Sequence, residues 1–195
     1  MTCIVKIGGS LCDDPQLGAW LELLVEFGAG KVIIVPGGGP YADVVRVQQA
    51  RWKFSDRIAH SLAVRAMEQF ALQLAGINTR LVLASKPTAP SDAVSKINVT
   101  VWLPSEMVLA APDIAQNWDV TSDSLAAWLA RKLNADRLIL MKSCQIPLDQ
   151  NLEHMAALGI LDQGFLAMAS GTKFLIDVVS VNELDRVRNI LTQLP

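Results

Sequence analysis

Two short stretches near the beginning of the chain combine residue types that handle negatively charged oxygen atoms. Each is a β-branched apolar run that breaks directly into glycines: Ile4-Val5-Lys6-Ile7-Gly8-Gly9-Ser10 and Val32-Ile33-Ile34-Val35-Pro36-Gly37-Gly38-Gly39-Pro40. Glycines let the backbone adopt positive φ angles and approach a ligand closely, with amide groups directed at it. Lys6 adds a positive charge beside the first turn. This combination predicts a site that handles phosphate groups.

The elements that must position these turns can be inferred from the pattern of apolar residues. Both runs are typical of strands in a parallel sheet, whose two faces are covered. Helical patterns follow them over 15–27 and 41–52, so helix N-termini that favour negative charge face the same space. Further strands are predicted over 79–84, 99–103, 137–141 and 174–179, and further helices over 56–75, 105–109, 122–133, 151–158 and 183–194.

This alternation of strands and helices predicts a three-layer α/β/α fold with a mainly parallel open sheet. In such sheets ligands bind beyond the carboxyl ends of the strands, where we expect both glycine turns, Asp123 and Lys142. The expected helix N-caps are Ser55 or Asp56, Thr121 or Ser122, and Asn182. The expected core-facing residues of the second and third helices are Val44, Val45, Val47, Ile58, Leu62, Met67, Phe70 and Leu74. Residues 159–171 are predicted to be irregular.

Composition and charge exclude several classes of function. With 195 residues, 51% of them hydrophobic and 18% charged, the sequence predicts a single compact domain over 1–195. A net charge of −2 provides no basic surface for a nucleic-acid backbone. No run approaches the roughly 20 apolar residues of a membrane span. Three cysteines without a C-x-x-C pair predict reduced thiols in a cytoplasmic protein.

Common nucleotide and catalytic motifs are absent. The sequence contains no G-x-x-x-x-G-K-[ST], no G-x-G-x-x-G after a strand and no G-x-S-x-G, which argues against a P-loop, a dinucleotide-binding site and an acyl-transfer serine. His60 and His154 lie far apart without ligand partners at regular spacing, so no protein-held metal is predicted.

The remaining motifs resemble those of the amino acid kinase family, which contains carbamate, acetylglutamate, aspartate and uridylate kinases. The resemblance spans nearly the whole chain and rests on Lys6-Ile7-Gly8-Gly9-Ser10, on Pro36-Gly37-Gly38-Gly39 and on Asp119-Val120-Thr121-Ser122-Asp123-Ser124-Leu125-Ala126-Ala127. It implies an ATP-dependent kinase that uses Mg²⁺ and forms a homo-oligomer, at least a dimer. Lys6 would stabilise the transferring phosphoryl group, and Asp123 would orient the lysines near the Mg²⁺-ATP region. The first turn (Gly8, Gly9, Ser10) would bind the ATP phosphates and the second (Gly37, Gly38, Gly39) the acceptor.

The residues suit this chemistry, because phosphoryl transfer depends mainly on positioning and charge stabilisation. A fixed lysine and converging amides supply both. The carboxylate of Asp123 would keep Lys6 charged and aimed.

A narrower resemblance concerns the acceptor. Residues 55–69 and 118–123 are similar to the branch linked to methanofuran biosynthesis and one-carbon metabolism, whose members phosphorylate an aminomethylfuran-methyl phosphate. The resemblance implies that Asp56 and Arg57 bind this acceptor and that His60 binds its phosphate, although helix capping, a solvated charge and a structural histidine are alternative interpretations. Alternative functions are a kinase of an amino acid carboxylate or nucleoside monophosphate, and a non-catalytic nucleotide- or oxyanion-binding storage protein.

The chain departs from the family pattern near its end. Many members carry a second catalytic lysine late in the chain, and residues 162–170 contain none. Met141-Lys142-Ser143 replaces the usual Thr-Asp pair, and one hypothesis is that Lys142 binds the β- and γ-phosphates instead. Of the five tryptophans, which suit a core or a subunit interface, Trp52 and Trp102 are alternative candidates for lining an aromatic acceptor pocket.

Overall fold

A six-stranded parallel β-sheet forms the centre of the protein in a computed structural model that describes residues 1–88 and 97–194. The strands are β1 (Cys3–Ile7), β2 (Val32–Pro36), β3 (Leu81–Ala84), β4 (Val99–Trp102), β5 (Arg137–Lys142) and β6 (Leu175–Ser180). Their order is β3-β4-β2-β1-β5-β6, and every neighbouring pair is parallel. The predicted mainly parallel sheet is confirmed, and all carboxyl ends therefore meet at one edge.

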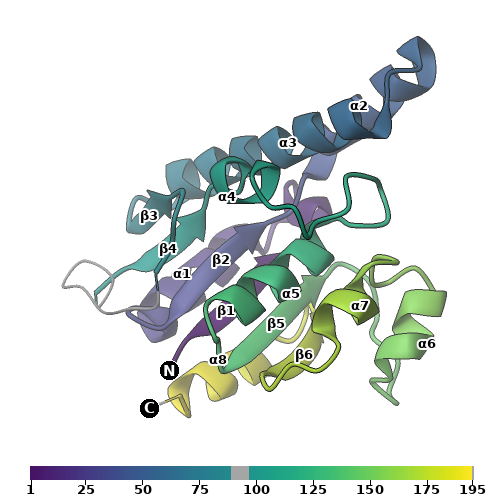
Figure 1. Ribbon diagram of the computed structural model, residues 1–195. Coiled ribbons are helices and arrows are strands. Elements are labelled where there is room, and N and C mark those ends of the chain that lie inside the picture. Colours follow the sequence, from purple (N-terminus) through teal and green to yellow (C-terminus); the bar gives the residue numbers. More distant parts are fainter. Residues whose placement is uncertain (89–96, 195) are drawn as a thin grey trace.

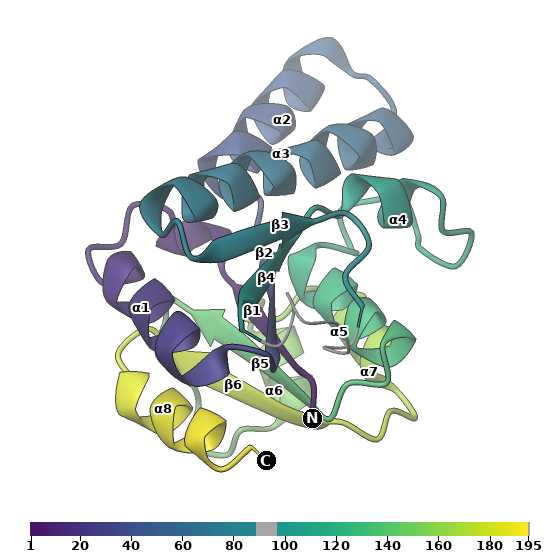
Figure 2. The ribbon, with the colours of Figure 1, turned by 90° about the vertical axis from the view of Figure 1, so that its left-hand side faces the viewer.

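Helices cover both faces of this sheet (Figures 1 and 2). On one face lie α1 (Leu17–Gly28) and α8 (Leu184–Thr192), and on the other lie α4 (Ser105–Leu109), α5 (Ser122–Lys132), α6 (Leu152–Ala157) and α7 (Phe165–Ala169). A short 3₁₀ helix, η1 (Gly9–Leu11), follows β1. The helices α2 (Gly39–Trp52) and α3 (Asp56–Ile77) form a hairpin whose connection points away from the sheet (Figure 1).

The strand register places two lysines on the same face of the sheet. Lys6 of β1 lies opposite Leu140 of β5, and Lys142 is two residues further along β5. Because side chains alternate along a strand, Lys6, Leu140 and Lys142 share a face. Leu140 belongs to the hydrophobic cluster that contains most of α5. Both lysines are therefore directed towards α5, which carries Asp123.

Two predicted helix faces were partly wrong. Val44 and Val47 are 60% and 63% exposed, whereas Val45 is buried, because α2 packs mainly against α3 and needs only a narrow apolar stripe. Ile58 and Leu62, in the outer turns of α3, are also exposed. The predicted core residues Met67, Phe70 and Leu74 are buried as expected.

Three local predictions also needed correction. Residues 159–171 contain α7, a helix of five residues that is too short to display a 3.6-residue period. The N-cap of α8 is Glu183 rather than Asn182, and the Asn182 side chain instead accepts a hydrogen bond from Gln16 at 3.0 Å. The helix predicted over 56–75 continues through Gly76 and ends at Ile77.

Candidate active site

The two glycine turns pack directly against each other, backbone to backbone. A Cβ on Gly9 would lie 2.0 Å from the backbone nitrogen of Gly39, and one on Gly37 would lie 2.2 Å from that of Gly9. Gly39 also has a φ angle of +53°. The N–H of Gly37 donates to the carbonyl of Ile7 at 2.9 Å, which ties the second turn to the end of β1. Only glycine fits these positions, and the predicted meeting of the two turns is observed.

Three charged side chains lie buried beneath the first turn. Lys6 Nζ forms an ion pair with Asp123 Oδ1 at 2.9 Å, and Lys142 Nζ donates to Asp123 Oδ2 at 2.5 Å. Each of these residues is less than 10% exposed. Gly8 connects the group to the first turn, because a Cβ at Gly8 would lie 3.8 Å from Lys6 Nζ. One carboxylate thus holds two ammonium groups, and the group keeps one net positive charge.

The environment of this triad shifts the protonation of two members. Burial, followed by repulsion from Lys6, lowers the pKa of Lys142 from 10.5 to about 8. For Asp123, burial alone would raise the pKa, but the charges of Lys6 and Lys142 outweigh it and lower the pKa below its usual value. Asp123 is therefore ionised at neutral pH, and Lys142 titrates within the range in which enzymes are assayed.

Asp162, which the sequence reasoning had not singled out, fixes the start of α5. Its Oδ2 accepts hydrogen bonds from Thr121 N at 2.9 Å, from Thr121 Oγ1 at 2.7 Å and from Ser124 N at 3.0 Å, and its Oδ1 accepts one from Ser124 Oγ. The N–H of Asp162 also donates to Asp123 Oδ2 at 3.3 Å. A residue from another loop thus caps α5 and holds Asp123 in place. No local sequence signal marks this role, because 38 residues separate Asp162 from Ser124.

The first turn also contacts the end of β5. Ser10 Oγ lies 3.0 Å from Ser143 Oγ, and a Cβ on Gly8 would lie 3.0 Å from the carbonyl oxygen of Met141. Gly8, Ser10 and Lys142, three of the four residues predicted to bind ATP phosphates, therefore lie at one sheet edge together with Ser143.

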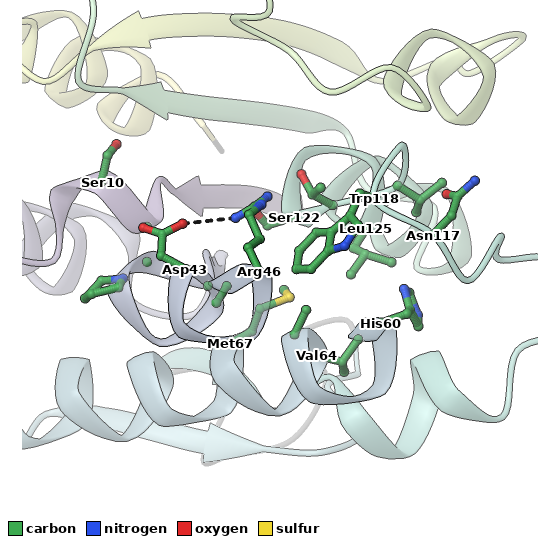
Figure 3. A pocket seen from close by; sticks show the side chains of 18 of the residues that line it. Ser10, Asp43, Arg46, His60, Val64, Met67, Asn117, Trp118, Ser122 and Leu125 are labelled. Atoms are coloured by element: carbon green, nitrogen blue, oxygen red, sulfur yellow. Dashed lines mark hydrogen bonds and ion pairs between the residues drawn. The ribbon is translucent and has the colours of Figure 1, made fainter. Parts of the chain in front are cut away.

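A cavity of about 420 Å³ opens beside the glycine turns (Figure 3). Its lining includes Gly9, Ser10, Gly38 and Gly39 from the two turns, Arg46 from α2, and His60, Val64 and Met67 from α3. The facing wall is formed by Trp118, Val120, Thr121, Ser122 and Leu125. The site thus joins a charged, buried triad to a partly apolar cavity through shared glycine backbone.

The aromatic wall of the cavity differs from the prediction. Trp102 is fully buried and stacks on Trp128 with ring centroids 6.2 Å apart, and Trp52 is 66% exposed. Neither is among the described residues that line the cavity. Trp118 lines it instead, held by a hydrogen bond from its indole nitrogen to Gln49 at 2.7 Å. The Arg46 guanidinium lies 4.1 Å from the centroid of the Trp118 ring.

The three predicted acceptor residues of α3 have different surroundings. His60 is 4% exposed and lines the cavity. Asp56 and Arg57 are exposed and lie outside the described cavity lining. Asp56 instead accepts a hydrogen bond from Gln49 Nε2 at 2.8 Å. Position along α3 distinguishes them, because Asp56 and Arg57 are its first two residues, whereas His60 lies one turn further into the helix.

The described residues contain no group of three or more His, Cys, Asp or Glu side chains that could hold a metal ion. The carboxylate of Asp123 is engaged by two lysines and that of Asp162 by the start of α5. Residues 1–88 and 97–194 thus provide no ready-made cage of such side chains for a divalent cation.

The fold and this site define the class of protein. The chain belongs to the amino acid kinase family, whose sequence signature matches residues 1–145, and it is a phosphotransferase. It is 28% identical over 96% of its length to [5-(aminomethyl)furan-3-yl]methyl phosphate kinase of Methanocaldococcus jannaschii, of which it covers 92%.

Solved structures share the fold at lower identity. Uridylate kinase of Archaeoglobus fulgidus superposes with a TM-score of 0.71 at 17% identity, over 99% of this chain and 96% of the other. An isopentenyl phosphate kinase gives 0.59 at 14% identity, over 98% and 96%. Within the described part of the chain, no helix has the length and apolar character needed to span a membrane.

Proposed function

We propose that the protein transfers the γ-phosphoryl group of Mg²⁺-ATP to a phosphate monoester, [5-(aminomethyl)furan-3-yl]methyl phosphate, and so forms a diphosphate. The single observation that carries the proposal is the placement of the Lys6–Asp123–Lys142 triad beneath the first glycine turn, against which the second turn packs. Transfer between two phosphates brings several negative oxygens together, and a net positive, buried triad with nearby amides stabilises that charge.

Each member of the triad has a distinct proposed role. Lys6, at the end of β1, stabilises the transferring phosphoryl group in the transition state. Lys142 binds the β- and γ-phosphates of ATP and takes the place of the late lysine of other family members. Asp123 holds both ammonium groups at 2.5–2.9 Å and keeps them from separating under their own repulsion. Gly8, Gly9 and Ser10 bind nucleotide phosphates, while Gly37, Gly38 and Gly39 hold the acceptor phosphate.

Mg²⁺ enters as part of the nucleotide substrate in this proposal. Magnesium is commonly bound by substrate phosphates and several waters with only one or two carboxylates. The engaged carboxylates of Asp123 and Asp162 agree with this arrangement.

Two observations support the furan acceptor. The relative whose name gives this compound as its substrate aligns with 96% of this chain. The cavity of about 420 Å³ is within the range of small-molecule sites, and its apolar side chains, including Trp118, suit a flat ring. The remaining proposed acceptor residues, Asp56 and Arg57, would have to act from outside the cavity lining.

The proposal is tested by ADP release from Mg²⁺-ATP with a panel of acceptors: the aminomethylfuran phosphate, UMP, isopentenyl phosphate and glutamate. We expect turnover with the furan compound and a diphosphate product in the ³¹P NMR spectrum, with turnover lost in Asp123→Asn. Turnover with UMP or glutamate alone would contradict the proposed acceptor but would leave the proposed kinase activity in place. ATP binding without turnover of any acceptor would instead support a non-catalytic nucleotide-binding protein.

We also propose that the protein forms a homo-oligomer in the cytoplasm. The exposed apolar side chains on the α2–α3 hairpin, Val44, Val47, Trp52, Ile58 and Leu62, are consistent with a subunit interface. Light scattering of the purified chain measures the mass directly, and a monomer at micromolar concentration would contradict the oligomer.

A further inference from the structure

The cavity changes its chemical character along its length. Ser10 and the glycine turns lie at one end and His60 at the other (Figure 3). Between them, Val64 and Met67 lie opposite Trp118 and Leu125, and Arg46 stacks on Trp118 (Figure 3). Residues 60, 64 and 67 fall on one face of α3, and at 1.5 Å per residue His60 lies about 10 Å from Met67 along the helix axis. A ligand with its phosphate at the glycines thus presents its far end to His60.

His60 has an unmet hydrogen bond at this far end. The side chain is 4% exposed, and its Nε2 is buried with no hydrogen-bond partner among the described residues. Burial also lowers the pKa of His60 below its usual value, so the ring is neutral at pH 7. A neutral imidazole with its proton on Nδ1 offers a lone pair at Nε2. Buried polar atoms are rarely left unpaired in native proteins, and a bound ligand would complete this one.

The charged side chains of the cavity do not decide which group binds at His60. Its ionisable lining residues other than His60 are Asp13, Asp43 and Arg46. Arg46 Nη1 forms an ion pair with Asp43 at 3.1 Å and stacks on Trp118, so its charge is already compensated. Asp43 lies near Ser10 and away from His60 (Figure 3), so recognition at the far end depends on the unpaired Nε2 of His60.

We propose that His60 Nε2 accepts a hydrogen bond from an amino group at the end of the acceptor opposite its phosphate, and that His60 thereby selects amine-bearing acceptors. This inference rests on the proposed function and adds to it the residue that determines specificity. A phosphate carried on a purely hydrocarbon chain would leave His60 unpaired and would be a poor substrate.

The test compares two acceptors, the aminomethylfuran phosphate and its analogue with a methyl group in place of the aminomethyl group. We expect the wild-type protein to prefer the amine in kcat/KM by about 10- to 100-fold, mostly through KM, which is the range for one buried hydrogen bond. His60→Leu should reduce the preference to within about threefold while retaining turnover of the methyl analogue. His60→Gln, which keeps an acceptor oxygen, should retain part of the preference and also serves if the leucine variant does not fold.

Ser61→Ala is the matched control, because Ser61 is the next residue of α3 and its hydroxyl accepts from Arg65 outside the cavity. It should behave as wild type. An unchanged preference in both His60 variants, or equal use of the two acceptors by the wild type, would overturn the role of His60 while leaving the kinase proposal intact. Turnover of neither furan compound would overturn the proposed acceptor and this inference together, and the wider acceptor panel identifies that outcome.

Discussion

Replacing Lys6 with methionine tests the catalytic role proposed for its charge in a variant that should keep the stability of the fold. Methionine keeps most of the side-chain volume and removes only the ammonium group. Asp123 remains paired with Lys142 at 2.5 Å, so no charge is left buried alone. Asp123→Asn is a less selective change, because it leaves two ammonium groups unpaired, and breaking a buried ion pair costs about 3–5 kcal/mol. We therefore expect Lys6→Met to fold normally.

The expected effect on turnover follows from the loss of one transition-state contact. Removing a single preorganised donor to developing charge costs about 2.7–4 kcal/mol, or roughly 100- to 1,000-fold in kcat. The KM for either substrate should change much less, since Lys6 is proposed to act on the transferring group. The assay is ADP release at saturating acceptor, with Lys173→Met as the control for loss of an exposed lysine.

The same variant should also shift the pH dependence of ATP use. Lys142 has a pKa of about 8, lowered first by burial and then by repulsion from Lys6. Its charged form is present below that pH and is lost as the pH rises through it, so kcat/KM for ATP should fall above about pH 8. In Lys6→Met the repulsion is absent, and the alkaline limb should move to higher pH. The reasoning is refuted if kcat stays within about threefold of wild type, or if the alkaline limb does not move.

Three further substitutions test the other parts of the site, and a fourth, at Gly76, is a control for the change at Gly37. Lys142→Arg carries a charge that does not titrate in the accessible range, so the decline of kcat/KM above about pH 8 should disappear from its pH profile. Gly37→Ala would place a Cβ 2.2 Å from the nitrogen of Gly9 and should cost about 1–3 kcal/mol, roughly 2–12 °C in Tm by calorimetry. Gly76→Ala, in a helix with open space around it, should instead raise Tm by about 2–4 °C. Asp162→Ala should leave the amides at the start of α5 without their acceptor, costing about 1–3 kcal/mol in urea unfolding and lowering kcat through a displaced Asp123; unchanged kcat would limit Asp162 to a structural role.

Residues close to each other in sequence carried most of the predictable part of the site. The glycine turns were visible because each directly follows a buried strand, and the parallel topology then required their carboxyl ends to meet. Lys6 and Asp123 came from motif and family resemblance, and the structure adds their 2.9 Å ion pair. The roles assigned to these residues stay predictions until the variants are measured.

Contacts over long sequence distances account for what could not be predicted. Asp162 reaches α5 across about forty residues, and no periodicity or motif encodes which loop caps which helix. Trp118 lines the cavity because Gln49, 69 residues earlier, holds its indole nitrogen. Trp102, by contrast, lies on β4 and stacks on Trp128 of α5 within the core. The sequence indicates that a tryptophan is large and buried, but only the tertiary packing decides which one faces a ligand.

The strand register supports the proposal that Lys142 takes the place of a lysine from late in the chain. Lys6 and Lys142 share the α5 face of the sheet because Lys142 lies two residues beyond Leu140, the residue opposite Lys6. A strand rises about 3.3 Å per residue, so their Cα positions are offset by about 7 Å along the strand direction. Two flexible side chains can close this offset onto one carboxylate, as the contacts at 2.5 and 2.9 Å show. A second ammonium on the neighbouring strand therefore needs no additional loop, and its lowered pKa is the consequence of placing two like charges in one buried site.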